Sequence, residues 1–335
     1  MKRELLRVSE LETTFFTDDG PVQAVDGVSF SLYEGEILGV VGESGCGKSV
    51  TSLSIMGLVP SPPGKITGGE IVYKEQDLTT FSQKEFRKIR GKDIAMIFQE
   101  PMTSLNPLFT IGSQLTEAIS IHNKEWSKKQ IRARAIEMMK LVGLPRAEEL
   151  FKDYPHQLSG GMRQRVMIAM ALVCDPAILI ADEPTTALDV TIQAQILALM
   201  KDLNRRLNTA VMMITHDLGV VAETCERVVV MYGGKIVEEG LVDEIFKNPQ
   251  HPYTKGLIQS IPDMRYKKQR LYAIPGNVPK PGSVTQGCRF AERCEFAFER
   301  CRLEEPVLYV VSPEHKSRCF LTEEVVADER AVIEG

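Results

Sequence analysis

One short stretch of this chain has residues spaced so that they can surround a phosphate group. Gly42, Gly45 and Gly47 lie within the sequence GESGCGKS, which fits the pattern G-x-x-x-x-G-K-[ST]. Glycines let the backbone approach a phosphate closely, so that its N–H groups can point at the anion. Lys48 can then reach the β- and γ-phosphates of a nucleotide, and the Ser49 hydroxyl can ligate Mg²⁺. The predicted nucleotide-binding residues are Gly42, Glu43, Ser44, Gly45, Cys46, Gly47, Lys48, Ser49 and Val50.

A second pair of chemically active residues ends an apolar stretch. The segment 177–181, AILIA, is followed at once by Asp182 and Glu183. Asp182 can hold Mg²⁺, directly or through water, and Glu183 can polarise an attacking water as a general base. The alternative is that the two residues are surface acids that cap the strand. The phosphate loop elsewhere in the chain makes this alternative less favoured.

The elements that must position these residues follow from the hydrophobic pattern. Residues 37–41 form a continuous apolar strand before the loop, and residues 49–58 suit a helix after it. This context argues against a Gly-rich turn that fits the pattern by chance. Strands alternate with helices through the rest of the chain, which predicts an α/β fold with a mostly parallel core sheet and an antiparallel edge. Further strands are predicted at 5–11, 22–32, 94–98, 177–181 and 210–214, helices at 112–150, 161–173 and 192–207, and a hairpin at Gly233–Gly234.

Length and charge exclude several classes of protein. The 335 residues suit one large domain with an appendage. The net charge is -5 and no block of Lys and Arg stands out, so we expect no nucleic-acid partner. Residues 1–7 lack the apolar core of a signal peptide, and no apolar run approaches the roughly 20 residues that span a bilayer. We therefore expect a soluble, cytoplasmic chain that reaches a membrane only through another polypeptide.

A second anion site is predicted at residues 158–165, which have the sequence LSGGMRQR. Ser159 can cap a helix there, and the following glycines bare its backbone N–H groups. The segment resembles the signature motif of the ATP-binding cassette (ABC) ATPases. The resemblance implies a head-to-tail dimer, in which each signature motif closes on the nucleotide held by the other domain's phosphate loop. The residues it assigns to this contact are Ser159, Gly160, Gly161 and Gln164.

Other positions match elements of the ABC ATPases in the order that the family has them. Gln99 matches the Q-loop glutamine, which senses Mg²⁺ and the attacking water, and His216 matches the switch histidine, which contacts the γ-phosphate. Asp189 matches the D-loop, which crosses the dimer interface. By this resemblance the catalytic residues are Glu183, His216 and Gln99. The Mg²⁺ ligands that it implies are Ser49, Gln99 and Asp182.

The resemblance covers roughly residues 5–250. It implies the P-loop NTPase fold of an ABC nucleotide-binding domain, with a mostly parallel core sheet, an antiparallel β subdomain and a helical subdomain. Phe15 matches the aromatic residue that stacks on adenine, and Phe16 and Tyr33 are alternatives. The predicted domains are an ABC ATPase domain at 1–255, with its helical subdomain at about 100–157, and a loop-rich C-terminal extension at 256–335.

Several segments resemble the ATPases of oligopeptide, dipeptide and nickel importers. They are QEPMTSLNP at 99–107, DEPTTALDVTIQAQ at 182–195 and HPYT at 251–254, and residues 161–170 look more like the D-type than the F-type ATPase. By resemblance, the chain couples ATP hydrolysis to peptide uptake. Its partners would be an F-type ATPase, two transmembrane permease subunits and an extracytoplasmic substrate-binding protein. It would lie on the cytoplasmic face of the inner or plasma membrane as a peripheral subunit.

Three other functions remain open. The first is import of nickel or another small solute by the same subgroup. The second is a soluble ABC ATPase acting on DNA or ribosomes, which a single cassette without sustained heptads makes less favoured. The third is a nucleotide-binding regulator without enzymatic activity, against which the intact Glu183 argues.

Four of the seven cysteines crowd near the C-terminus, in a proline-broken segment with little apolar mass. An odd total without an export signal argues against a disulfide scaffold, and a metal would stabilise such a segment. The thiolates can bind a [4Fe–4S] cluster or zinc, or stay unligated, and the C-x₂₋₄-C spacing usual for zinc is missing. Some members of the importer subgroup resemble this tail and carry a [4Fe–4S] cluster, which favours that hypothesis. The four candidates are Cys288, Cys294, Cys301 and Cys319.

Overall fold

The computed structural model describes residues 2–98, 105–186, 188–261, 272–284 and 286–323. The chain divides into two compact units, each assembled from several chain segments. The first unit comprises Met1–Leu5, Leu32–Ile37 and Thr80–Ile214. The second comprises Leu6–Ser31, Leu38–Thr79 and Thr215–Gly335.

Parallel strands form the core of the first unit. Strand β7 (Ile178–Asp182) pairs in parallel with β6 (Ile94–Ile97) on one side and with β8 (Ala210–Thr215) on the other. All residues of β7 and β8 are buried. A parallel strand is covered on both faces, so it needs the continuous apolar run that the sequence shows. The predicted parallel core is confirmed.

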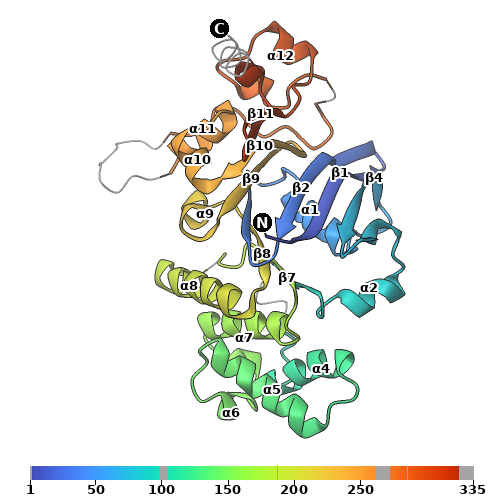
Figure 1. Ribbon diagram of the computed structural model, residues 1–335, viewed down its shortest axis with the longest axis vertical. Helices are drawn as coiled ribbons and strands as arrows, with labels where there is room; N and C mark the ends of the chain where they lie inside the picture. The colour runs from blue at the N-terminus through green and yellow to red at the C-terminus, as the bar shows by residue number, and fades with distance from the viewer. Residues whose placement is uncertain (1, 99–104, 187, 262–271, 285, 324–335) are drawn as a thin grey trace. The chain divides into compact units, whose positions relative to one another are not determined.

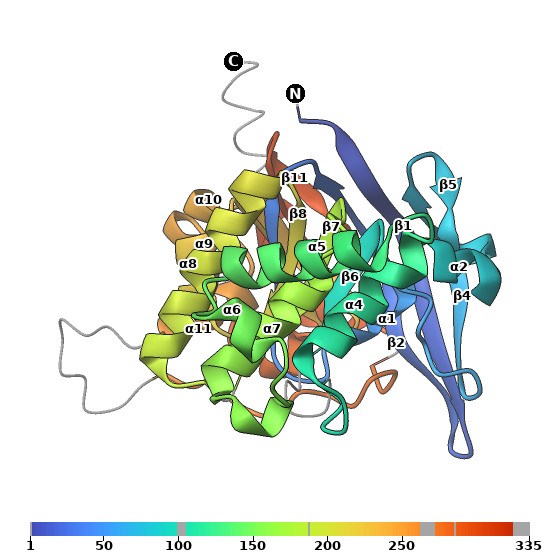
Figure 2. The ribbon, with the colours of Figure 1, turned by 90° about the horizontal axis from the view of Figure 1, so that it is seen from below.

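Helices form the rest of the first unit. Helices α4 (Ile111–His122), α5 (Lys128–Leu141), α6 (Ala147–Leu150) and α7 (Gly160–Leu172) lie together in the green part of Figure 1 and face the viewer in Figure 2. Side-chain caps begin α4, α5 and α7, and α7 also contacts α8 (Val190–Leu207). In the described part of the chain, none of the helices is long and apolar enough to cross a membrane. The other helices of this unit are α2 (Gln83–Ile89) and the 3₁₀ turn η2 (Pro155–Gln157).

An antiparallel sheet forms one part of the second unit (Figure 1). Its order is β2-β1-β4-β5, and β1 pairs antiparallel with β4. Helix α1 contacts this sheet, where the Thr13 and Ser54 hydroxyls are 2.9 Å apart. The predicted strands at 5–11 and 22–32 are present and extend further than the sequence pattern. The bounds are β1 (Glu4–Thr17), β2 (Gly20–Tyr33), α1 (Lys48–Ile55), β4 (Gly64–Tyr73), β5 (Gln76–Asp77) and η1 (Leu78–Thr80).

A second group of strands in this unit includes residues of the C-terminal extension. Strand β3 (Ile37–Val41) is parallel to β9 (Arg227–Tyr232), which turns at the predicted Gly233–Gly234 into antiparallel β10 (Lys235–Leu241). Strand β12 (His315–Ser317) pairs with β10, and β11 (Tyr309–Ser312) pairs with β12. The remaining elements are α9 (Leu218–Thr224), α10 (Val242–Lys247), α11 (Pro252–Gln259), η3 (Ala291–Arg293) and α12 (Glu299–Leu303).

Three aromatic rings join the extension to these strands. The ring centroids of Tyr232 and Phe290 are 5.2 Å apart, and those of Tyr253 and Phe290 are 5.4 Å apart. All three side chains are buried in one core cluster, against which Cys288 and Cys294 pack. The extension thus shares apolar core with β9 and β10, whereas the sequence suggested a segment with little apolar mass. The division at residues 255 and 256 stays a prediction, and α11 runs across it.

The start of α11 carries a buried titratable group. His251 Nδ1 accepts the N–H of Tyr253 at 3.1 Å, which requires an unprotonated ring nitrogen. Burial lowers the pKa of His251 to about 4. As the pH falls, the unfolded chain binds a proton below its pKa of roughly 6.5, before the folded chain does. The stability that depends on neutral His251 is therefore present above roughly pH 6.5. It is lost as the pH falls from there to about 4.

We expect the free energy of unfolding to fall by about 3 kcal/mol between pH 7 and pH 4 through His251 alone. His251→Asn keeps an N-cap acceptor and removes the titration, so its stability should decline less over this range. Urea denaturation of both proteins at several pH values measures the difference. If the free energy of unfolding declined equally with pH in both proteins, His251 would not be the cause of the decline.

Candidate functional site

The predicted phosphate loop joins buried β3 to α1, as the sequence indicates. Gly45 and Gly47 have φ angles of 82° and 103°, in the region that glycine adopts readily. A Cβ atom on Gly47 would lie 2.6 Å from the Ala24 carbonyl oxygen, whereas one on Gly45 would meet no described atom within 4 Å. Gly47 is therefore required by tight packing behind the loop. Gly45 is required by its backbone angle on the open side, where a phosphate can approach.

The first turn of α1 can present N–H groups to an anion. Its N-cap is Gly47, and no described side chain caps this end. Lys48 Nζ donates to the carbonyl oxygens of Gly42 at 2.7 Å and Glu43 at 3.0 Å, so the ammonium group lies against the loop. Burial raises the pKa of the Cys46 thiol, and nearby Lys48 only partly opposes this. The thiol is therefore neutral.

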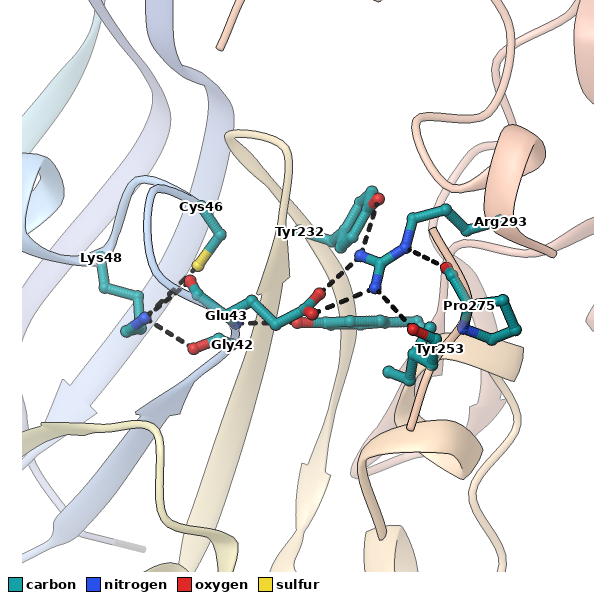
Figure 3. A network of polar contacts seen from close by, with 9 residues as sticks. Gly42, Glu43, Cys46, Lys48, Tyr232, Tyr253, Pro275 and Arg293 are labelled. Atoms are coloured by element: carbon teal, nitrogen blue, oxygen red, sulfur yellow. Dashed lines mark hydrogen bonds and ion pairs between the residues drawn. The ribbon is translucent and has the colours of Figure 1, made fainter. Parts of the chain in front are cut away.

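Two residues from the C-terminal part of the chain hold Glu43, the second residue of the loop (Figure 3). The Glu43 N–H donates to the Tyr253 hydroxyl at 2.8 Å. Its carboxylate accepts from Arg293 Nη1 at 2.7 Å and Nη2 at 3.1 Å. Sequence reasoning noted Tyr253 only as part of HPYT and missed Arg293, because no local pattern connects either residue with the loop.

The predicted acidic pair ends β7. Asp182 is buried, and Glu183 follows it with a φ of 48°. The Glu183 N–H donates to the Ile214 carbonyl at 2.9 Å, and the Thr186 hydroxyl donates to Glu183 Oε2 at 2.8 Å. A positive φ at a non-glycine residue is strained and is enriched at functional sites. The turn after β7 therefore fixes both the backbone and the carboxylate of Glu183.

The predicted signature residues fall into two groups. Ser159 caps α7 by accepting the Met162 N–H, and it is exposed together with Gly160. A Cβ atom on Gly161 would lie 2.9 Å from the Ile192 side chain of α8, so this glycine permits close helix packing. Gln164 is fully buried, and its Nε2 donates to the Pro184 carbonyl. Gln164 thus braces the turn after Glu183, and contact of these four residues with a partner's nucleotide stays a prediction.

The remaining catalytic candidates lie at the ends of strands and helices. His216 is exposed and directly follows β8. Asp189 Oδ1 accepts the Ile192 N–H at 2.9 Å and caps α8, a structural role that the sequence did not predict. Gln99 lies outside the described residues. The phosphate loop and His216 belong to the second unit, whereas the acidic pair, Asp189 and the signature segment belong to the first.

The aromatic candidates for adenine stacking differ in orientation. Phe15 is half-buried and, two residues along β1, shares a strand face with Thr13, which contacts α1. Phe16 is 55% exposed and lies on the opposite face. Phe15 therefore faces the side of the sheet on which α1 packs, and its stacking on adenine stays a prediction.

The four C-terminal cysteines line one cavity. Cys288, Cys294, Cys301 and Cys319 surround it together with apolar side chains such as Phe320. Burial raises the pKa of Cys288 to about 12 and that of Cys319 to about 11, so these thiols are neutral at physiological pH. Among the described residues, no group of three or more His, Cys, Asp or Glu side chains is arranged to hold a metal ion.

Known proteins resemble both the cassette and the extension. Residues 25–186 match the family described as ABC transporter, and residues 237–301 match the C-terminal region of oligopeptide/dipeptide transporters. The oligopeptide transport ATP-binding protein AppD of Bacillus subtilis is 55% identical, over 97% of this chain and 99% of the relative. The chain belongs to the ABC transporter ATP-binding proteins.

Other relatives agree with this assignment. The dipeptide transport ATP-binding protein DppD of Escherichia coli is 48% identical over 94% of this chain and 96% of its own length. A solved dimeric ATP-binding cassette with ADP and Pi bound is 31% identical, with a TM-score of 0.63 over 71% of this chain and 98% of that one. The predicted fold class and the resemblance to the oligopeptide and dipeptide subgroup are confirmed. This ABC protein binds and hydrolyses ATP.

The contrast between two glycines gives a test of the loop geometry. Gly47→Ala should lower the free energy of unfolding by about 1–3 kcal/mol and weaken ATP binding, because of its φ and its packing against Ala24. Gly20→Ala is the matched control, since Gly20 also has a positive φ, of 115°, but a Cβ atom there meets no described atom within 4 Å. Denaturant titration and equilibrium ATP binding measure both variants. Equal stability of the two variants would contradict this account of the loop.

Proposed function

We propose that this ABC ATPase couples ATP hydrolysis to the uptake of peptides across a membrane. The observation that carries the proposal is the match of residues 237–301 to the C-terminal region of oligopeptide/dipeptide transporters. Relatives named oligopeptide and dipeptide transport ATP-binding proteins match almost the whole chain. The cassette match at 25–186 alone names no cargo, so the extension is what favours peptides over nickel or another small solute.

Within the nucleotide site, the loop N–H groups and Lys48 bind the phosphates of ATP. Ser49, Asp182 and Gln99 are the residues that would hold Mg²⁺, and the ion would neutralise charge on the phosphates. Glu183 accepts a proton from the attacking water, and His216 contacts the γ-phosphate. The orientation of Glu183 by Thr186 supports this role, because a general base must be held within hydrogen-bond reach of its water.

The complete site requires a second ATPase subunit, for which the F-type paralogue is the proposed partner. The capped N-terminus of α7, with exposed Ser159 and Gly160, is a second place where backbone N–H groups can meet an anion. The matched cassette with ADP and Pi bound is dimeric, which supports a head-to-tail pair. Gln164 then acts on the partner's nucleotide only through the turn that it braces.

The other proposed partners are two transmembrane permeases and an extracytoplasmic substrate-binding protein. The helical subdomain at about 100–157 would supply the docking surface for the permeases, on the cytoplasmic face of the membrane. Large apolar side chains next to these helices support this, since Leu108 is 79% exposed and Phe109 is 53% exposed. A hollow on α4 and α5 adds polar groups from Thr116 and Arg132.

Transport by the assembled system tests the proposed cargo. The chain would be produced with its permeases, F-type ATPase and binding protein in membrane vesicles. ATP-dependent accumulation of labelled dipeptides or oligopeptides is the expected result. Accumulation of nickel without peptide would favour the alternative cargo, and isolation of the chain on ribosomes or DNA would favour a soluble ABC ATPase.

Glu183→Gln tests the general base. We expect ATP turnover to fall by about 10²–10⁴-fold while ATP binding is retained, because the amide accepts no proton from water. Phosphate release and equilibrium ATP binding give the two measurements. Glu149→Gln, at an exposed carboxylate in the first unit, is the control and should turn over ATP normally. Undiminished turnover in Glu183→Gln would remove Glu183 from this role.

We further propose that the cysteine cavity holds a [4Fe–4S] cluster. The convergence of Cys288, Cys294, Cys301 and Cys319 on one largely apolar cavity supports it, since thiolates are the ligands of such clusters. The C-x₂₋₄-C spacing usual for zinc is missing, which favours the cluster over zinc. The buried thiols become thiolates only with a cation beside them, because burial disfavours the charged form. When bound, the cluster would stabilise the fold of the extension.

Anaerobic purification tests this site. The expected result is about four iron and four sulfide ions per chain, with a visible absorption band. Cys301→Ser should lower the iron content, whereas Cys174→Ser, outside the cavity, should not. One zinc ion per chain, or metal-free protein with native stability, would overturn the cluster.

A further inference from the structure

The guanidinium group of Arg293 donates hydrogen bonds to several acceptors. Its Nη1 and Nη2 donate to the Glu43 carboxylate, and Nη1 also donates to the Tyr232 hydroxyl at 3.3 Å (Figure 3). Its Nε donates to the Pro275 carbonyl at 2.8 Å, and Nη2 donates to the Ile274 carbonyl at 3.4 Å. A guanidinium has five N–H donors, and these contacts use every one. Such a group has a single favourable orientation.

The surroundings keep Arg293 charged and rigid. Its side chain is 5% exposed and lies over the rings of Tyr232 and Phe290. Burial opposes the charge, but the hydrogen bonds to Glu43 and Tyr232 outweigh burial and raise the pKa of Arg293. A forked pair between a guanidinium and a carboxylate is stronger than a neutral hydrogen bond and more specific in direction. Glu43 is therefore held at one position.

Glu43 passes this constraint to the rest of the loop. Its carbonyl oxygen accepts from Lys48 Nζ at 3.0 Å and from the Cys46 N–H at 3.3 Å. Its own N–H is bound to the Tyr253 hydroxyl. A shift of Glu43 would therefore move the ammonium group of Lys48 and the turn that leads into α1.

We propose that Arg293 and Tyr253 are positioning residues, which act through Glu43 to hold the phosphate loop in the conformation that accepts ATP. The extension would thus contribute to nucleotide binding without touching the nucleotide. This inference rests on the proposed assignment of residues 42–49 as the phosphate loop. It also connects two segments that the sequence singled out: Tyr253 lies in HPYT, and Arg293 directly precedes Cys294 in the cysteine-rich segment.

The extension has other attachments that keep it folded without this pair. Arg289 and Lys235 both contact the Asp26 carboxylate of β2, the second at 3.1 Å. Strand β12 pairs with β10, where His315 Nε2 lies 2.8 Å from buried Glu238. The contact between Arg293 and Glu43 can therefore be removed while the extension stays in place.

Arg293→Met tests the proposal in the full-length chain, because it keeps an apolar stem and removes the fork. We expect the KM for ATP to rise on the order of tenfold, with kcat changed by less than about threefold. Hydrogen exchange of the amides at residues 42–47 should become faster, whereas exchange in β7 should not change. A contact that only stabilises the fold would accelerate exchange in both places.

Three further variants make the test specific. Arg300→Met is the matched control, since Arg300 also precedes a cavity cysteine and lies over an aromatic ring, but pairs with Glu304 and Glu323. It should leave the KM for ATP unchanged. Glu43→Gln combined with Arg293→Met should be no worse than Arg293→Met alone, because both act on one contact. Tyr253→Phe should make hydrogen exchange at the Glu43 amide faster. This variant tests the proposal if Arg293→Met does not fold.

The outcomes separate this proposal from the site assignment. An Arg293→Met protein with KM and loop exchange within twofold of the parent would overturn the positioning role, as would equal effects of Arg300→Met. Lys48→Ala tests the loop itself and should abolish ATP binding. If Lys48→Ala bound ATP normally, the assignment of residues 42–49 would fail instead.

Discussion

A loop that binds phosphate through its backbone must be held in shape by its neighbours. Glycines such as Gly45 and Gly47 give the loop angles that other residues resist, but they also have the largest conformational freedom to lose. Buried β3 holds one end and α1 the other. The Ala24 carbonyl supports the loop from behind, and Glu43 is held from the C-terminal extension. Several segments of the second unit therefore hold the loop in its conformation.

Each unit contains a helix whose N-terminus can bind an anion, but the residues around the two helix ends differ. Helices α1 and α7 each begin in a glycine-rich segment whose N–H groups can face an anion. At α1 the segment includes Lys48, so it carries its own positive charge. At α7 it has only Ser159 and glycines, and buried Gln164 connects the helix with the turn after Glu183. The start of α7 therefore offers backbone N–H groups without a phosphate-binding lysine.

The C-terminal extension is part of the cassette's core. Phe290 packs against both Tyr232 and Tyr253, and the cysteine cavity adjoins the same cluster. Arg293, which binds Glu43, is the last residue of the short helix η3, and Cys294 of the cavity directly follows it. Tyr253 and Arg293, both within the region that matches oligopeptide/dipeptide transporters, therefore contact the same residue of the phosphate loop.

Features that depend on near neighbours were predictable from the amino-acid sequence alone. Local spacing predicts the phosphate loop, the acids ending β7, the Ser159 cap and the hairpin at Gly233–Gly234. It can do so because backbone angles and helix caps depend on residues close together in the chain. The fork from Arg293 to Glu43 joins residues 250 positions apart, and no local pattern marks such a pair. Tertiary structure also decided that Gln164 is buried and that the four cysteines face one cavity. The physical reason is that burial and long-range pairing depend on how elements pack, which spacing along the chain does not encode.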